Sequence, residues 1–323
     1  MPRLLRRDTL LRLAAVGLAM VMVSSCAVRT DQIARDPNTV RIAVNGWVGY
    51  EASAVVLEHI LKEEMGYQVQ LVRLEEQPSW QALDQGVLDV ILENWGHEDL
   101  YELYGPEGND TVVDGGSTGN DGVIGWYMPA YVAEEYPEIT TLEGIKEHAD
   151  IFRTAETGDK GEFLGGSPGF ATQDQGMINA FDLDIEIVYA GSEASQVTEV
   201  RRRYANEEPV LFYFNEPQWL QQELDLVKVD FPDYYDGCDA DLEFVDCDYP
   251  LYDLNKIFRK GFVEDGGHAY RFLDNWHWTN ADQNEVAAMI ADQGLDPSEA
   301  AEIWVEENPD VWREWLPEGY ENR

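Results

Sequence analysis

The chain has 323 residues, of which 63 are acidic and 22 are lysine or arginine, and its net charge is −41 at neutral pH. Such a charge repels nucleic acids and anionic lipids, so the composition argues against a nucleic-acid-binding protein. Because 44% of the residues are apolar and ten are tryptophan, we predict a globular body with an acidic surface rather than a disordered acidic tail.

The first 25 residues have the pattern of an export signal. Four arginines accompany an apolar run from Leu13 to Val23, which is too short for a membrane-spanning helix. The following Val23-Ser24-Ser25-Cys26 resembles a bacterial lipobox, in which Cys26 is lipidated and becomes the new N-terminus. The alternative is an ordinary signal peptide cut at a nearby small residue. Residues 26–39 are polar and lack periodicity, as expected of a tether between a membrane anchor and a folded body.

The folded body is predicted to begin at Val40 with alternating strands and helices. Strands are expected near 40–44, 68–74 and 88–92, and helices near 51–65 and 79–85. This order indicates a parallel sheet with right-handed crossovers. Ligands of such sheets bind beyond the carboxyl ends of strands, and Trp47 and Trp95 both follow a predicted strand end.

A second alternation follows, with helices expected near 172–181 and 194–205 and strands near 184–189, 210–214 and 224–229. Residues 160–169 are rich in glycine, and the pattern from Leu251 onward predicts helices to the end, with tryptophans on their buried faces. Removing 25 of the 323 residues leaves 298, which is large for one core and typical of two lobes. We expect an α/β fold in which residues 40–127 and 230–323 form lobe I and residues 128–229 form lobe II, each built on a mainly parallel sheet.

Cys238 and Cys247 remain as an even pair once Cys26 is lipidated, so we expect a disulfide between them. A zinc site is the alternative, but none of the five histidines forms a spaced pair with these cysteines. The acidic runs 239–241 and 246–248 lack the glycine and terminal glutamate of a calcium loop. We therefore predict no metal site and no cofactor.

Catalytic motifs are scarce in the sequence. It contains no Gly-x-Ser-x-Gly, no His-Glu-x-x-His and no phosphate-binding loop. With so many acidic residues, an arbitrary pair of carboxylates is no evidence of a glycosidase. We predict a binding protein rather than an enzyme. A secreted hydrolase with an aromatic groove and a sensory subunit that signals without transport remain the alternatives.

Aromatic residues gather at predicted strand ends: Trp47, Trp95, Trp126 with Tyr127, and Tyr213 with Phe214. Aromatic faces attract cations that donate few hydrogen bonds, such as quaternary ammonium groups, at roughly 0.5 to 2 kcal/mol per ring. For any one of these rings alone, a place in the core is the better explanation. Their coincidence at four strand ends favours an aromatic cage.

Several of these stretches resemble the glycine betaine, proline betaine and choline substrate-binding proteins of ABC importers. The similar stretches are Asn45-Gly46-Trp47, Leu61–Tyr67, Ala82–Asp89, Glu93-Asn94-Trp95, Gly125–Tyr131, Gly191-Ser192-Glu193 and Phe214–Trp219. The resemblance implies a type II periplasmic-binding-protein-like fold that closes on an osmolyte and delivers it to a permease and its ATPase. It also implies cage walls at Trp47 and Trp95, a further ring from Trp126 or Tyr127, and polar neighbours from Asn45, Glu93 and Asn94.

Residues 213–220 depart from the family pattern. Many members have Trp-x-Pro-His-Trp here, in which the first Trp is a cage wall and the His is a carboxylate partner. If the prolines align, Asn215 replaces that Trp and Gln218 replaces the His, which leaves Phe214 or Tyr213 to complete the cage. Gln218 can donate a hydrogen bond to a carboxylate but brings no positive charge. The expected function is capture of glycine betaine or a relative by a lipid-anchored monomer at the outer face of the cytoplasmic membrane.

Overall fold

The computed structural model describes residues 36–170 and 172–320, so the expected signal and Cys26 lie outside the described residues. From Asp36 onward the chain forms one compact unit. Its strands are β1 (Thr39–Val44), β2 (Gln68–Arg73), β3 (Val90–Asn94), β4 (Val112–Pro129), β5 (Gly161–Gly165), β6 (Ile185–Tyr189), β7 (Leu211–Glu216), β8 (Leu226–Lys228) and β9 (Leu251–Arg259). Its helices are α1 (Val48–His59), α2 (Glu76–Asp84), α3 (Glu98–Tyr104), α4 (Ala130–Glu135), α5 (Leu142–His148), α6 (Asp174–Phe181), α7 (Glu193–Ala205), α8 (Lys260–Asp265), α9 (Gly267–Asn275), α10 (Asn280–Ala291), α11 (Pro297–Glu307) and α12 (Pro309–Trp312).

All strands belong to one sheet, in the order β2-β1-β3-β9-β4-β7-β5-β6, with β8 paired to β4. The strands β2, β1 and β3 are parallel and form the first half-sheet. The strands β7, β5 and β6 are also parallel and form the second half-sheet. Two antiparallel strands, β9 and β4, lie between them. The predicted α/β architecture, with parallel strands connected through helices, is confirmed.

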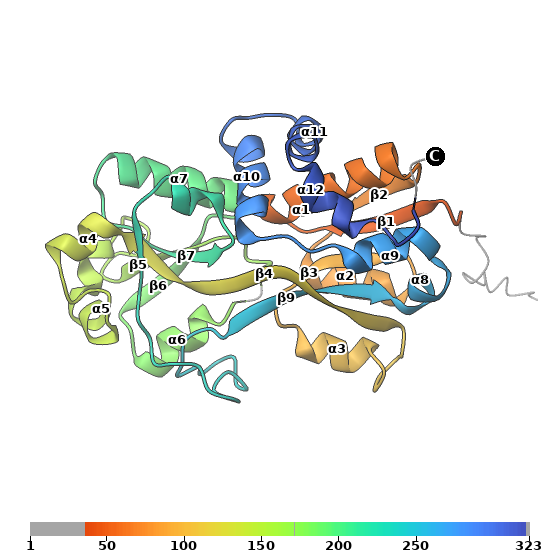
Figure 1. Ribbon diagram of the computed structural model, residues 1–323. Coiled ribbons are helices and arrows are strands. Elements are labelled where there is room, and N and C mark those ends of the chain that lie inside the picture. Colours follow the sequence, from red (N-terminus) through yellow and green to blue (C-terminus); the bar gives the residue numbers. More distant parts are fainter. Residues whose placement is uncertain (1–35, 171, 321–323) are drawn as a thin grey trace, which may run out of the picture. The chain divides into compact units, whose positions relative to one another are not determined.

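The long strand β4 connects the two half-sheets. Its first part, from Val112 to Val123, pairs with β9, and its second part, from Val123 to Tyr127, pairs with β7. Val123 is therefore the residue at which the partner strand changes. Figure 1 shows β4 and β9 lying side by side along the middle of the sheet.

The strand β9 corrects the prediction that the chain is helical from Leu251 onward. Residues Leu251–Arg259 lie between β3 and β4, and Leu254, Ile257 and Phe258 are fully buried. A strand inside a sheet is covered on both faces, which hides the alternation that identifies strands in a sequence. The helices expected after this strand are present as α8 to α12. The strand β5 was also missed, because glycines at both of its ends resemble a loop.

Apolar side chains form two clusters that lie on opposite faces of the second half-sheet. In β7, Phe212 and Phe214 belong to the cluster that also covers the first half-sheet, whereas Leu211 and Tyr213 belong to the other. Successive residues of a strand point to opposite faces, so one strand serves both clusters. The tryptophans of the C-terminal helices are buried in the first cluster: Trp276, Trp278, Trp304, Trp312 and Trp315.

Cys238 and Cys247, the pair expected from the sequence, form a disulfide with Cα atoms 6.1 Å apart. Over residues 36–170 and 172–320, no helix is both long and apolar enough to cross a membrane. In the same residues no group of three or more histidine, cysteine or acidic side chains is arranged to hold a metal ion.

Candidate ligand-binding site

Three aromatic rings from different loops meet beyond the strand ends. The Trp47 ring lies 6.5 Å from Trp95 and 5.9 Å from Phe170, measured between centroids, and both contacts are edge-to-face. Together with Glu76 and Asn215, these rings line a cavity of about 30 Å³. We refer to these five residues as the cage.

Strand topology explains why the rings converge. Trp47 follows β1 and Trp95 follows β3, and these parallel neighbours end at the same edge of the first half-sheet. Phe170 comes from the second half-sheet, in the loop after β5. A second layer supports the rings, since Tyr252 of β9 lies 5.7 Å from Trp95 and Tyr213 of β7 lies 6.0 Å from Phe170. The cage therefore combines groups from both half-sheets.

The cavity is small for the ligand class that the rings suggest. A volume of about 30 Å³ corresponds to roughly one water molecule. Trp47, Trp95 and Phe170 are all partly exposed, so none of them is enclosed by the core. Entry of a trimethylammonium group therefore requires these rings to separate, and a hinge between the half-sheets would allow this.

Glu93 holds Trp47 from behind. Its carboxyl group is 2% exposed and accepts hydrogen bonds from Trp47 Nε1–H at 3.1 Å, Ser53 Oγ–H at 3.0 Å and Gln283 Nε2–H at 2.9 Å. Burial raises the pKa of Glu93 to about 7, against the opposing effect of these hydrogen bonds. The carboxyl group fixes the orientation of the indole and, when ionised, adds negative charge behind the ring that would face a cation.

The polar lining of the cavity consists of a carboxyl group and an amide. Glu76 Oε2 lies 3.3 Å from His97 Nε2. Asn215 donates its Nδ2–H to the carbonyl oxygen of Pro217 at 3.2 Å. Neither the carboxyl group of Glu76 nor the amide of Asn215 is a cation, and a carboxylate attracts positive charge. The cage as built therefore favours a positively charged ligand.

The segment from Tyr213 to Gln218 contributes to the cage through alternate residues. Tyr213 and Asn215 reach the cage side of β7, while Phe214 points to the opposite face. Beyond the cis Glu216–Pro217 peptide bond, Gln218 Nε2–H donates to Glu193 Oε1 at 2.6 Å. The other oxygen of Glu193 accepts the backbone N–H of Val48 at 2.8 Å. Burial raises the pKa of Glu193, and these two donors act against that rise.

The structure does not bring Trp126, Tyr127, Phe214 or Asn45 to the cage. Trp126 is fully buried, 4.1 Å from the Phe163 ring, and donates its Nε1–H to Asp174 at 2.7 Å. Tyr127 faces the other side of β4 and packs on Phe214 at 5.7 Å, because neighbouring residues of a strand point in opposite directions. Asn45 is buried and joins β1 to α2 through hydrogen bonds to Leu74 and Ser79.

Sequence reasoning missed three contributors: Phe170, Glu76 and Tyr252. Phe170 follows a strand that was not recognised, and Tyr252 lies in a strand interpreted as helix. Glu76 is the first residue of α2, which begins three residues before its predicted start at position 79. A correct assignment of β5 would have placed Phe170 just beyond a strand end, the same signal that identified Trp47 and Trp95.

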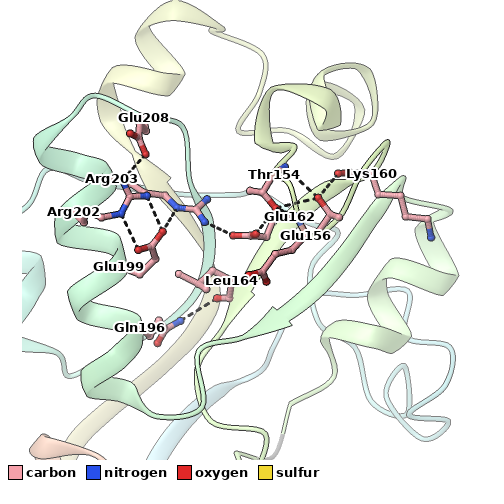
Figure 2. A network of polar contacts seen from close by, with 11 residues as sticks. Thr154, Glu156, Lys160, Glu162, Leu164, Gln196, Glu199, Arg202, Arg203 and Glu208 are labelled. Atoms are coloured by element: carbon pink, nitrogen blue, oxygen red, sulfur yellow. Dashed lines mark hydrogen bonds and ion pairs between the residues drawn. The ribbon is translucent and has the colours of Figure 1, made fainter.

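A larger cavity lies elsewhere and shares no lining residue with the cage. It is an open hollow of about 730 Å³ between α7 and the outer strands of the second half-sheet. Figure 2 shows the network that lines it, in which Arg203 contacts Glu162 and Glu199, and Arg202 contacts Glu199 and Glu208. Hydrogen bonds from Arg202 and Arg203 lower the pKa of Glu199 to about 2. Because Arg202 and Arg203 are both paired with acidic side chains, neither arginine is free to bind an anion, and we assign the hollow a structural role.

Comparison with known proteins identifies the family. The sequence profile described as "Substrate binding domain of ABC-type glycine betaine transport system" (OpuAC) matches residues 38–307. The chain belongs to this family. Members of this family are substrate-binding domains rather than enzymes, which confirms that prediction.

Two curated relatives are similar over about half of their length. The glycine betaine/carnitine transport binding protein of Listeria monocytogenes is 30% identical over 149 residues, which are 46% of this chain and 45% of that protein. The glycine betaine/proline betaine-binding periplasmic protein of Escherichia coli is 26% identical over 172 residues, half of each chain.

Solved structures extend the similarity of the fold over most of the chain. Lactococcal OpuAC in complex with glycine betaine has a TM-score of 0.68 at 20% identity and covers 86% of this chain and 99% of its own. ProX from Borrelia burgdorferi has a TM-score of 0.69 at 21% identity and covers 87% of this chain and 97% of its own. A choline-binding protein in complex with choline has a TM-score of 0.68 at 22% identity and covers 86% of this chain and 91% of its own. The predicted type II binding-protein fold is thus confirmed.

Proposed function

We propose that this chain is an extracytoplasmic solute receptor that binds a quaternary ammonium compound in the cage and delivers it to an ABC importer. The observation that carries the proposal is the meeting of Trp47, Trp95 and Phe170 around one cavity with Glu76, while Glu93 lies behind Trp47. Aromatic faces with nearby carboxylates attract a cation that has no N–H groups to donate. Family membership and the named ligands of the curated relatives support the same ligand class.

We further propose that the half-sheets belong to two lobes that close on the ligand. Residues 40–127 with 230–323 would form lobe I, and residues 128–229 would form lobe II. The paired strands β4 and β9 support this division, because they lie between the two half-sheets and connect them. Phe170 and Trp47 are already in contact here, so opening would separate them for ligand entry, and closure would restore the contact and present a combined surface to a permease and its ATPase.

The proposal for cellular location rests on the N-terminal sequence. Export and lipidation at Cys26, which would hold the protein at the outer face of the cytoplasmic membrane, are supported by the lipobox-like Val23-Ser24-Ser25-Cys26. Expression of the full chain in a bacterial host tests this. We expect the wild type in the membrane fraction and Cys26→Ala in the soluble fraction, and an unchanged distribution would contradict the anchor.

The Trp95→Ala variant tests the binding proposal. Because Trp95 is partly exposed and lines the cavity, its loss removes one cage wall with little effect on the core. We expect quaternary ammonium ligands to bind about tenfold more weakly in titration calorimetry, which corresponds to about 1.4 kcal/mol. The melting temperature of the empty protein should change little.

The matched control is Tyr189→Ala, which removes an aromatic ring that is 47% exposed and lines the other cavity. Its affinity should equal that of the wild type. Unchanged binding in Trp95→Ala would place the ligand outside the cage.

A further inference from the structure

The carboxyl group of Glu193 accepts hydrogen bonds from two donors next to Trp47, the backbone N–H of Val48 and the side-chain amide of Gln218, and we refer to these two donors as the anion-binding corner. Glu193 is the first residue of α7, in the second half-sheet region, and is 9% exposed. Its Oε2 accepts the backbone N–H of Val48, the residue directly after Trp47, at 2.8 Å. Its Oε1 accepts Nε2–H of Gln218 at 2.6 Å. Both partners are donors, so the carboxyl group satisfies them without carrying a proton.

This corner is where an anionic group of a ligand would otherwise bind. Val48 begins the 12-residue helix α1, and the first N–H groups of a helix lack partners within it and carry partial positive charge. The Gln218 amide adds a second donor from the opposite half-sheet. Glu193 accepts a hydrogen bond from each of these two donors. An anionic group of a ligand could bind them only after the carboxyl group of Glu193 had moved away.

The cationic side chains nearby are also engaged by acidic residues. Arg73 pairs with Glu51, and Arg201 pairs with Glu223 and with Asp292 at 2.7 Å. These arginines line a neighbouring cleft of about 430 Å³ together with Trp47 and Glu193. Among the described residues that line the cage itself, none is lysine, arginine or histidine.

The glycine-rich loop after β5 does not offer a better place for an anion. A Cβ atom on Gly169 would lie 2.9 Å from Glu75 Oε2, so this loop faces a carboxylate. Glu75 therefore lies beside this loop, Glu76 lines the cage, and Glu193 lies next to Val48. A carboxylate on the ligand would add like charge to these acidic groups.

We propose that the ligand is a quaternary ammonium cation without a carboxylate, of the choline class, and that Glu193 sets this selection by occupying the anion-binding corner. This inference rests on the proposed function and specifies its substrate class. Choline and glycine betaine share the trimethylammonium group that the rings would hold. They differ at the other end, where choline has a hydroxyl group that can donate a hydrogen bond to the carboxylate of Glu193, whereas glycine betaine has a carboxylate of its own.

Titration calorimetry of the purified chain with choline, glycine betaine and tetramethylammonium tests the inference. We expect the wild type to bind choline at least about tenfold more tightly than glycine betaine, because one nearby like charge is enough for such a ratio. In Glu193→Gln this ratio should shrink about tenfold. The matched control Glu147→Gln removes the same charge from an exposed carboxyl group of α5 that lines neither the cage nor the neighbouring cleft, and it should keep the wild-type ratio.

The outcomes separate the two proposals. Glycine betaine binding as tightly as choline, with both lost in Trp95→Ala, would overturn the selection by Glu193 and leave the proposed function in place. A ratio that is the same in Glu193→Gln and in the wild type would overturn the role of Glu193. If none of the three compounds binds the wild type, the proposed function fails and the inference fails with it. The wild-type comparison requires no variant to fold.

Discussion

The carboxyl group of Glu93 links folding to binding at the scale of single residues. Three side chains donate hydrogen bonds to it: Trp47, Ser53 and Gln283. Because burial raises its pKa from 4.5 to about 7, the folded protein holds a proton on Glu93 over a pH range in which the unfolded chain has lost it. Unfolding then releases a proton, and stability must fall as the pH rises from about 4.5 to 7.

Glu93→Gln tests this linkage. The shift from 4.5 to about 7 corresponds to about 3 kcal/mol of stability that the wild type loses over this range, at about 1.4 kcal/mol per unit. The variant cannot ionise and should lack this contribution. Asp174, whose pKa burial raises to about 6, is present in both proteins, so its effect cancels in the comparison.

The measurement is urea unfolding of both proteins at pH 5 and pH 8. We expect the free energy of unfolding of the wild type to fall relative to that of the variant between these two pH values. Equal pH dependence in the two proteins would show that Glu93 is already ionised at pH 5.

Single residues also show where sequence reasoning succeeds. Trp47 and Trp95 were predicted because each directly follows a strand whose end is marked in the sequence. Trp126 lies inside a strand, and the face to which it points depends on which cluster covers that face. That information comes from tertiary packing, so the sequence alone left Trp126 and Tyr127 as equal candidates.

At the scale of elements, the antiparallel pairing of β4 with β9 positions Trp95. Gly122 of β4 pairs with Tyr252 of β9, and a Cβ atom at position 122 would lie 2.8 Å from the Trp95 ring and 2.9 Å from Leu254. The absence of a side chain lets the indole rest against the strand. The position of one cage wall therefore depends on a glycine in the element that connects the half-sheets.

We predict that Gly122→Ala weakens binding of a quaternary ammonium ligand at least about fivefold and lowers the melting temperature, because the new methyl group displaces Trp95. Calorimetry and thermal unfolding measure the two effects.

Gly115→Ala is the matched control on the same pair of strands. Its Cβ atom would lie 2.3 Å from the Phe258 ring, away from the cage, so this variant should lose stability and keep its affinity. Equal affinities in Gly122→Ala and the wild type would show that the pairing of β4 with β9 does not position Trp95 for ligand binding.

Elements differ in how well the sequence predicts them. The strands of the first half-sheet and the helices between them were predicted to within a few residues, because their apolar periodicity and glycine caps are local signals. The strand β9 was missed because Lys256 interrupts its apolar run, and that lysine is buried. Its Nζ–H groups donate to the carbonyl oxygens of Asp274 and Trp276 at 2.8 Å, partners that lie far along the chain.

At the scale of the whole molecule, the two half-sheets belong to one continuous sheet, whereas the sequence suggested a separate sheet for each lobe. The pairings of β4 with β7 and of β9 with β3 join strands that are far apart in the sequence, and no local pattern encodes them. The cage depends on this joining, because Phe170 and Asn215 come from one half-sheet and Trp47 and Trp95 from the other.

The net charge of −41 acts on the same scale. An acidic surface attracts cations toward the cage and repels anions, although salt screens this effect beyond about 10 Å at 0.1 M. The steering is therefore general, and discrimination between ligands must come from the cage and from Glu193.

The proposed function requires the cage to recognise positive charge and not only apolar shape. Titration calorimetry with choline and with 3,3-dimethyl-1-butanol, its uncharged analogue of nearly equal shape, separates these two modes of recognition. We predict that choline binds at least about tenfold more tightly, since the rings and nearby carboxylates stabilise the charge. Equal affinity for the two compounds would show instead that the site is an apolar pocket indifferent to charge.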